Sequence, residues 1–167
     1  EQLLLSGAWT ALRTRPFSRI PSPQTAPNSI FVSAMDTNPL AANPEPIIAS
    51  KAAEFSAGLS VLSRLTDGAV HLCQDGSLAL DASNHDSVTN HVFEGPHPAG
   101  LPGTHIHFVD PVSPNKTVWF VGYQDVIAIG HLFLHGTVLS ERIVALGGPG
   151  VSAPRLLKTC VGANLEQ

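Results

Sequence analysis

The sequence has no long hydrophobic run, few charged residues and no cluster of basic residues. Its longest apolar stretch, Val126 to Leu134, is far too short to span a bilayer and contains His131. Charged residues make up 13% of the chain and the net charge is -4, so the basic footprint of a nucleic-acid-binding protein is missing. With 167 residues, 43% of them hydrophobic, the chain can form one domain with a real core and offers weakly charged surface to other chains.

Cysteine and catalytic motifs are also scarce. The 2 cysteines, Cys73 and Cys160, are far apart, which favours reduced thiols over a disulfide or an iron–sulfur site. The patterns G-x-S-x-G, G-x-G-x-x-G and G-x-x-x-x-G-K-[ST] are missing, and no local group of carboxylates is suited to acid–base catalysis. We therefore expect no catalytic residue here. The chain begins without Met and without a signal peptide, so we expect a piece of a longer protein.

Hydrophobic periodicity predicts helices that alternate with strands. The expected helices are residues 2–12, 50–66 and 123–134. The expected strands are residues 30–35, 69–73, 88–94 and 116–121. Stretches rich in proline, glycine or polar residues predict irregular or extended chain at residues 13–28, 39–46, 76–87 and 95–103. This alternation predicts an α/β fold with a mostly parallel sheet and flanking helices.

Two further strands are expected at residues 142–146 and 155–160. They are separated by the sequence GGPG, and no helix fits between them. We therefore predict a hairpin that begins a second, β-rich module.

Two polar segments are candidates for a ligand site. The strand at 30–35 ends in Asp36-Thr37-Asn38-Pro39, and polar residues at such a strand end can line a ligand crevice, which makes Asp36 and Asn38 candidates. The earlier segment RTRPFSR carries Arg13, Arg15 and Phe17. Arginine donors and an aromatic ring can hold a polar aromatic ligand. From the residues alone, an arginine-rich contact with a neighbouring protein of a complex is the stronger interpretation.

Histidine pairs raise the question of a metal site. His105 and His107 would share one face of a strand, and His131 and His135 would share one face of a helix. Zinc needs three or four ligands, and no cysteine pair or glutamate stands at ligand spacing near either pair. Hydrogen-bonded histidines are the stronger interpretation, so we predict no metal. The segment GPHPAGLPGTH lacks a phosphate-loop spacing, and no helix clearly follows it, so a rigid structural loop is expected.

Several sequence words resemble one family. RTRPFS, AMDTNPLA, YQDVIAIG and VALGGPGVSAPRLLKTCVGANL, in this order, are similar to the middle part of the A subunits of bacterial sodium-translocating NADH:quinone reductases. The resemblance covers essentially the whole chain. It implies a Rossmann-like domain at residues 1–140, followed at 141–167 by the start of a β-grasp-type SLBB module.

A more distant resemblance links the chain to the FMN- and NADH-binding flavoprotein subunit of respiratory complex I. That family has a Gly-rich loop of the GRGGAGFP type where this chain reads LRTRPFSRIP. Side chains keep the backbone away from a phosphate, and Pro16 has no N–H to offer. The resemblance therefore implies the flavoprotein fold without its FMN loop.

The resemblance implies a peripheral subunit on the cytoplasmic face of the bacterial inner membrane. Such a subunit carries no redox cofactor, is associated with binding of the substrate ubiquinone, and contacts other subunits, notably the membrane-embedded B subunit. FMN, FAD, riboflavin and Fe–S centres belong to other subunits. Matched through the RTRPFS word, the expected quinone-proximal residues are Arg13, Arg15, Phe17 and Ser18. Asp36 and Asn38 are added from strand-end geometry.

Two alternatives stay open at this point. The chain could be a purely structural docking subunit in which a vestigial flavin crevice is closed. It could also be an electron-carrying enzyme that still binds FMN or NAD, although the lost glycines argue against this alternative.

Overall fold

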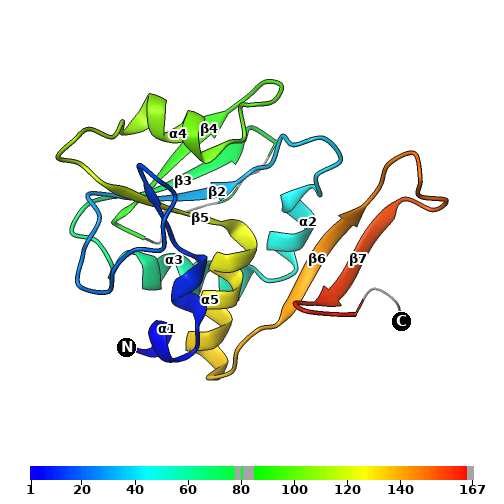
Figure 1. The fold of residues 1–167 in the computed structure, drawn as a ribbon, viewed down its shortest axis with the longest axis horizontal. Helices are drawn as coiled ribbons and strands as arrows, with labels where there is room; N and C mark the ends of the chain where they lie inside the picture. Colours follow the sequence, from blue (N-terminus) through cyan, green and yellow to red (C-terminus); the bar gives the residue numbers. More distant parts are fainter. Residues whose placement is uncertain (78–79, 81–84, 165–167) are drawn as a thin grey trace.

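The computed structural model describes residues 1–77, 80 and 85–164. Within these residues, five strands form one sheet in the order β1-β5-β2-β3-β4, and two more form a separate hairpin (Figure 1). Strand β1 runs antiparallel to β5, and the other neighbours are parallel. The sheet strands are β1 (Arg13–Arg15), β2 (Ile30–Ala34), β3 (Val70–Asp75), β4 (Val88–Phe93) and β5 (Val118–Gly122). The predicted α/β class with a mainly parallel sheet is confirmed.

Helices cover both faces of the sheet (Figure 1). On one face lie α3 (Ala52–Leu62) and α5 (Tyr123–His135), with α2 (Pro44–Ala49) beside them. On the other face lies α4 (Pro102–Val109). Strand β2 is buried along its whole length because neighbouring strands and helices enclose it. This burial explains why its sequence, IFVSA, is an almost continuous apolar run.

Two glycines let α3 and α5 pack with their backbones in contact. A Cβ on Gly130 would lie 1.7 Å from the carbonyl oxygen of Glu54, and a Cβ on Gly58 would lie 2.2 Å from that of Val126. Neither distance can accommodate a side chain. These glycines therefore fix how the two helices face each other, and Glu54 is held against the last turns of α5.

The hairpin of β6 (Glu141–Leu146) and β7 (Arg155–Cys160) confirms the final pair of predicted strands. Its first strand is attached to the start of α5. The Gln124 side chain accepts from the backbone N–H of Ile143 at 2.9 Å and donates to its carbonyl at 3.0 Å, and Arg142 pairs with Asp125. These contacts fix the hairpin beside the domain.

Three local expectations were wrong. The single helix at 2–12 is instead α1 (Gln2–Leu5) and a 3-10 turn, η1 (Ala8–Ala11), because Gly7 between them has a left-handed φ of 78°. The loop after residue 12 contains β1, whose hydrogen bonds come from pairing with distant β5. The stretch expected to be extended by its prolines contains α2, in which Pro44 stands in the first turn, where no N–H is needed.

The expectations for the two cysteines are confirmed, whereas the loop predicted at 76–87 can be checked only in part. Both cysteines are free, Cys73 buried and Cys160 exposed. Burial raises the pKa of the Cys73 thiol to about 12, so it stays protonated and unreactive. Part of the predicted loop at 76–87 lies outside the described residues. Among the described residues, none of the helices is long and apolar enough to cross a bilayer.

Candidate functional site

The carboxyl ends of β2 and β5 form the switch point of the sheet. From β2 the chain continues to β3 and β4 on one side, and it then returns to β5 on the other side of β2. The crevice outside such a pair of strand ends is where open α/β sheets bind ligands. Asp36 follows β2 at this end, and Gly122 ends β5 and leads directly into α5.

A pocket of about 590 Å³ lies beside the end of β5, within the size range of small-molecule sites. Below it is called the Arg13 pocket. One wall is apolar and comes from α5, and the rim carries charged groups from three segments of the chain. Among the lining residues are Arg13, Phe120, Gly122, Asp125, Ala128, Ile129, Leu132 and Arg142.

The charged groups at the rim are held in place by their partners. Arg13 donates through Nη1 to the carbonyl oxygens of Thr10 and Leu12. A guanidinium has five N–H donors, so Arg13 can keep both bonds and still donate to a ligand. Arg142 is paired with Asp125, which lies in the first turn of α5. The rim thus presents oriented donors beside an apolar wall.

Arg15 shares the face of β1 with Arg13, since side chains alternate along a strand. Its guanidinium lies 5.4 Å from the centre of the Phe120 ring, which also lines the Arg13 pocket. Its Nε is buried and has no hydrogen-bond partner among the described residues. Beside Arg15 is a smaller pocket of about 260 Å³, walled by Ile106, His107 and Val112. Arg15 therefore positions the ring that borders the larger pocket.

Phe17 and Ser18 form a turn beyond β1. Both have positive φ values, 77° and 49°, which side chains disfavour. The turn is held by hydrogen bonds from Ser18 N–H to the Thr14 carbonyl at 2.9 Å and from Thr14 N–H to the Arg19 carbonyl at 2.8 Å. Phe17 is 78% exposed. The turn thus holds an aromatic side chain out in solvent.

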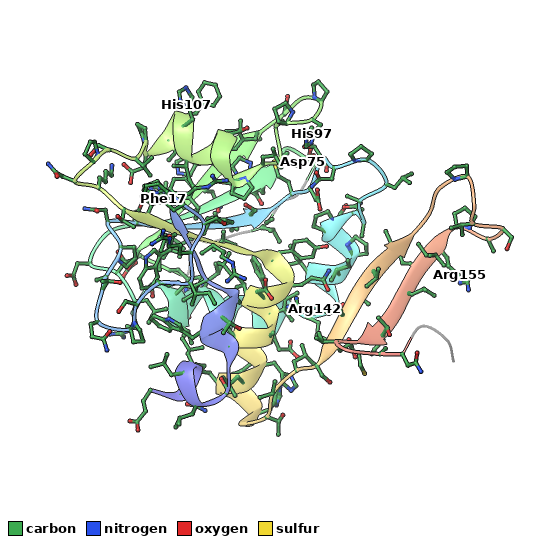
Figure 2. All side chains as sticks on the ribbon, in the orientation of Figure 1. Phe17, Asp75, His97, His107, Arg142 and Arg155 are labelled. Carbon is green, nitrogen blue, oxygen red and sulfur yellow. The ribbon has the colours of Figure 1, made fainter. Side chains whose placement is uncertain are left out.

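Asp36 and Asn38 lie at the opposite end of the sheet from this turn. Because β1 is antiparallel to β5, the chain leaves β1 at the amino end of the parallel strands. Figure 2 shows Phe17 on one side and His97 and Asp75 at the other end, where β3 finishes. The Asp36 carboxylate accepts from the backbone and side-chain N–H groups of Asn38, at 2.9 and 2.7 Å. The six predicted site residues therefore do not line one pocket.

The predicted loop 95–103 covers this strand end. The backbone N–H of Gly100 donates to the hydroxyl oxygen of Thr37 at 2.9 Å, and a Cβ on Gly100 would lie 2.7 Å from the Thr37 nitrogen. The expectation that no helix follows this loop was wrong, because α4 begins at Pro102.

His105 and His107 were also misplaced, since they lie on helix α4 rather than on a strand. They point to different sides: His105 is fully buried, and His107 is exposed. His105 Nε2 is 2.9 Å from the carbonyl oxygen of Ala99, and burial lowers its pKa to about 4. It is therefore neutral and donates through Nε2 at physiological pH.

The second histidine pair does share a helix face, and it has an acidic neighbour from another helix. His131 and His135 have ring centres 4.5 Å apart on α5. Glu54 on α3 lies 3.9 Å from His135 Nε2. Possible metal-ligand atoms of these three residues lie within 4.8 Å of one another. Sequence spacing missed Glu54, because only helix packing brings it to the pair.

Other site residues escaped the sequence analysis for similar reasons. Phe120 was placed in a strand but not beside the arginines, because the β1–β5 pairing was not foreseen. Asp125 and Arg142 were placed in separate elements. One usable signal was overlooked: Pro102 after a loop is typical of the first turn of a helix.

The mainly parallel sheet with a switch point between β2 and β5, and the helices on both of its faces, define a Rossmann-like α/β fold, and a β-hairpin follows it. Residues 1–138 match the family model described as "NqrA second alpha/beta domain", and residues 143–167 match "NQRA C-terminal domain". The chain belongs to the NqrA family.

Curated relatives agree with this assignment. The chain is 62% identical to the A subunit of the Na(+)-translocating NADH-quinone reductase of Klebsiella pneumoniae over 99% of its length. It is 56% identical to the protein of that name from Photorhabdus laumondii over 99% of its length, and 59% identical to that of Tolumonas auensis over its full length. The chain spans 37% of the length of each of these relatives. Their names describe one component of an oxidoreductase complex.

Proposed function

We propose that this chain works as part of the A subunit of a sodium-translocating NADH:ubiquinone reductase and that the quinone headgroup binds in the Arg13 pocket. The subunit is peripheral, at the cytoplasmic face of the bacterial inner membrane, and has no redox cofactor of its own. FMN, FAD, riboflavin and Fe–S centres reside on other subunits, and the membrane-embedded B subunit is the nearest partner. Residues 1–140 form the Rossmann-like unit, and 141–167 begin the SLBB module.

The observation that carries the proposal is the pairing of an apolar wall with arginine donors in the pocket beside the carboxyl end of β5. A quinone has a flat apolar ring and two carbonyl acceptors. Ala128, Ile129 and Leu132 supply apolar contact, and Arg13 can donate to a carbonyl oxygen. Arg15 has a positioning role, because its guanidinium lies over the Phe120 ring.

The remaining predicted residues have different places in this proposal. Phe17 and Ser18 lie on the turn beyond β1, and Asp36 bonds to Asn38 at the other end of the sheet. None of these four is among the residues that line the Arg13 pocket. We therefore restrict the proposed quinone contact to Arg13, with Arg15 acting through Phe120.

The test uses the assembled complex and separates quinone binding from chemistry. Arg13→Ala removes a charged donor, and Ala128→Trp fills the pocket. Loss of one charged hydrogen bond should raise the KM for quinone about tenfold. Arg19→Ala is the matched control, because Arg19 lies outside this pocket, near Phe17. A photoreactive quinone should label residues of the pocket in wild type and not in Ala128→Trp.

The proposal fails if both variants keep wild-type KM and labelling in a fully assembled complex. NADH oxidation with an artificial acceptor serves as the control for intact electron entry. If that rate falls together with quinone reduction, the variants have damaged assembly rather than the quinone site.

A second candidate, a purely structural docking role, is supported by a different observation. Phe17 and Phe108 are 78% and 73% exposed, and large aromatic side chains of this kind are enriched where proteins contact each other. In addition, loop 95–101 closes over the turn after β2. Under this alternative, Phe17→Ala with Phe108→Ala weakens assembly, whereas Arg13→Ala changes nothing.

A further inference from the structure

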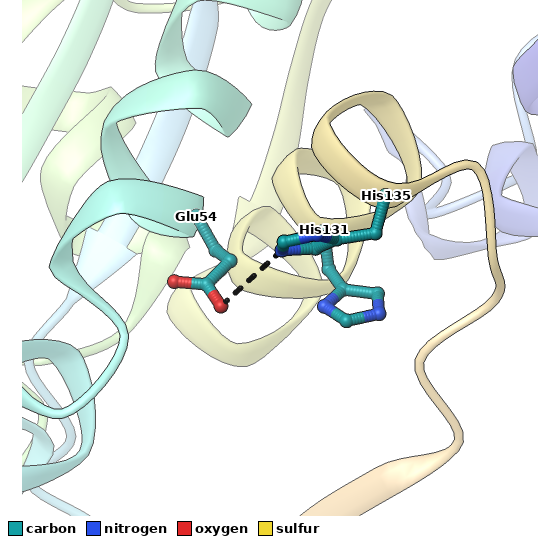
Figure 3. A group of neighbouring side chains, drawn as sticks. All are labelled: Glu54, His131 and His135. Atoms are coloured by element: carbon teal, nitrogen blue, oxygen red, sulfur yellow. Dashed lines mark ion pairs between the residues drawn. The ribbon is translucent and has the colours of Figure 1, made fainter.

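The pair of helices α3 and α5 brings together three side chains with metal-binding chemistry. Figure 3 shows Glu54 reaching from α3 toward His131 and His135 on α5. The two histidines are one helical turn apart, so their rings lie on the same side. These residues lie outside the Arg13 pocket, and the proposed function does not use them.

The backbone holds the donors at a fixed separation. Because Gly130 contacts the backbone at Glu54, the backbone of Glu54 is held next to the turn of α5 that carries His131. Close approach of two helices through glycine leaves little freedom for either one to slide. The cluster is therefore set by helix packing and not by a mobile loop.

One ring nitrogen of His131 is available to bind a ligand. Its Nδ1 is buried and has no hydrogen-bond partner among the described residues, whereas its Nε2 lies 3.2 Å from the Thr137 hydroxyl. Metal-bound histidines usually have one nitrogen on the metal and the other on a hydrogen-bond partner that orients the ring. Thr137 can play that orienting role and leave Nδ1 for an ion.

We propose that Glu54, His131 and His135 bind a divalent transition-metal ion, with Zn²⁺ as the best match. Two imidazoles and one carboxylate are a familiar zinc ligand set, which leaves a fourth position for water. Ligand atoms around a tetrahedral ion at about 2.0 Å lie about 3.3 Å apart. From a spread within 4.8 Å, this requires small rotations, and half-exposed His135 can make them.

The electrostatic surroundings favour a cation. His135 is the last residue of α5, so the site lies at the negative end of that helix dipole. The carboxylate of Glu141 pairs with Lys158, and this hydrogen bond is the main reason that the pKa of Glu141 is lowered; Lys51 and His131 contribute less. An ion here would tie α3 to the end of α5, where the chain leaves for β6.

The test is metal binding by the purified protein at its full natural length, stripped with a chelator. Co²⁺ added as a probe should give the intense visible spectrum of a tetrahedral site, and one equivalent of Zn²⁺ should displace it. His135→Ala and Glu54→Gln should each weaken Zn²⁺ binding at least tenfold in competition with a coloured chelator. His107→Ala, an exposed histidine on α4, is the matched control and should bind like wild type.

Thermal unfolding supplies an independent readout. Zn²⁺ should raise the unfolding midpoint of wild type and of His107→Ala but not that of His135→Ala, because an ion stabilises only the state that binds it. Without metal, the three midpoints should agree, which shows that the variants fold. The inference is overturned if wild type gives no tetrahedral spectrum, or if His135→Ala binds Zn²⁺ as tightly as wild type.

Discussion

On one face of the sheet, α3 and α5 cover a large apolar core; on the other, α4 covers a small one. The first core contains buried residues of strands β2, β3 and β5 and of helices α1, α2, α3 and α5, among them Val32, Leu62 and Ile129. The second consists of Phe31, Cys73, Ile106 and Val118, with partly buried hydrophobic residues around it. Buried apolar area is the main source of stability, so the α5 face should hold the fold together.

The α4 face, by contrast, carries polar groups in an apolar setting. His71 Nδ1 lies 3.0 Å from His91 Nε2, and His105 packs on Phe93 with ring centres 4.4 Å apart. Burial, and secondarily the neighbouring charge of His91, lowers the pKa of His71. This face should therefore contribute less to stability and make stability depend on pH.

The largest effect on stability is expected when a substitution adds a methyl group between α3 and α5, on the face with the larger core. Gly130→Ala places a Cβ against the Glu54 backbone, which cannot move without separating the helices. We expect a loss of more than about 4 kcal/mol in the free energy of unfolding, beyond the usual range for overpacking. Denaturant unfolding monitored by circular dichroism measures it. Gly150→Ala, with open space around its Cβ position, is the control; equal midpoints for the two variants would contradict the α5 contact.

The same substitution, isoleucine to alanine, can be made on each face of the sheet to compare how much each face contributes to stability. Ile129 on α5 and Ile106 on α4 are both nearly inaccessible, at 1% and 3% exposure. Truncation to alanine should cost about 4 kcal/mol for Ile129→Ala and about 2 kcal/mol for Ile106→Ala, because the thinner α4 layer can collapse into the space. Chemical denaturation of both variants under one set of conditions gives the difference. If Ile106→Ala costs as much as Ile129→Ala, the α4 face is as structural as the other.

Stability should also depend on pH through the α4 face. His105 has a folded-state pKa of about 4, below the unfolded value of about 6.5, because burial disfavours its charged form. Its neutral form favours folding above about pH 6.5, and this contribution is lost as pH falls toward 4. The loss is about 3 kcal/mol at most. His105→Gln keeps a donor for the Ala99 carbonyl and cannot titrate, so its stability should fall less steeply with acid.

The slope of the free energy of unfolding against pH, compared between wild type and His105→Gln, shows how much of the pH dependence comes from His105. His71 also has a lowered pKa and stays in the variant, so part of the pH dependence should persist. Parallel profiles for wild type and His105→Gln between pH 6.5 and about 4 would assign the effect to other groups.

The difference between the faces also explains what could be predicted from the sequence. Strand β2 and helix α5 were identified because their burial appears as the mostly apolar runs IFVSA and VIAIGHLFL. Strand β1 consists of three half-buried polar residues. It forms because it pairs with β5, so the hydrophobic pattern of its own residues does not predict a strand. Helix α4 was hidden by the proline and glycine that precede it, and its two histidines were misassigned as a result.

The candidate site residues were also predicted where local sequence was informative and missed where packing between distant segments brings residues together. The resemblance led to Arg13 and Arg15, and strand alternation puts them on one face. Their separation from Asp36 depends on β1 running antiparallel, which is a property of the whole sheet. Glu54 joins His131 only through the glycine contact of α3 and α5. Residues brought together by packing between distant segments could not be paired from one sequence.

The smallest effect on stability is expected at the most exposed aromatic of the β1 turn. Phe17 is 78% exposed, and its left-handed backbone is held by bonds of Thr14 and Ser18 rather than by its ring. Phe17→Ala should therefore change the free energy of unfolding by less than about 0.5 kcal/mol. Leu5→Ala, with Leu5 82% exposed, is a control of the same kind on the α5 side. A loss above about 1 kcal/mol for Phe17→Ala alone would mean that the turn supports the fold, whereas an unchanged stability with weaker assembly of the complex would assign the ring to a partner surface.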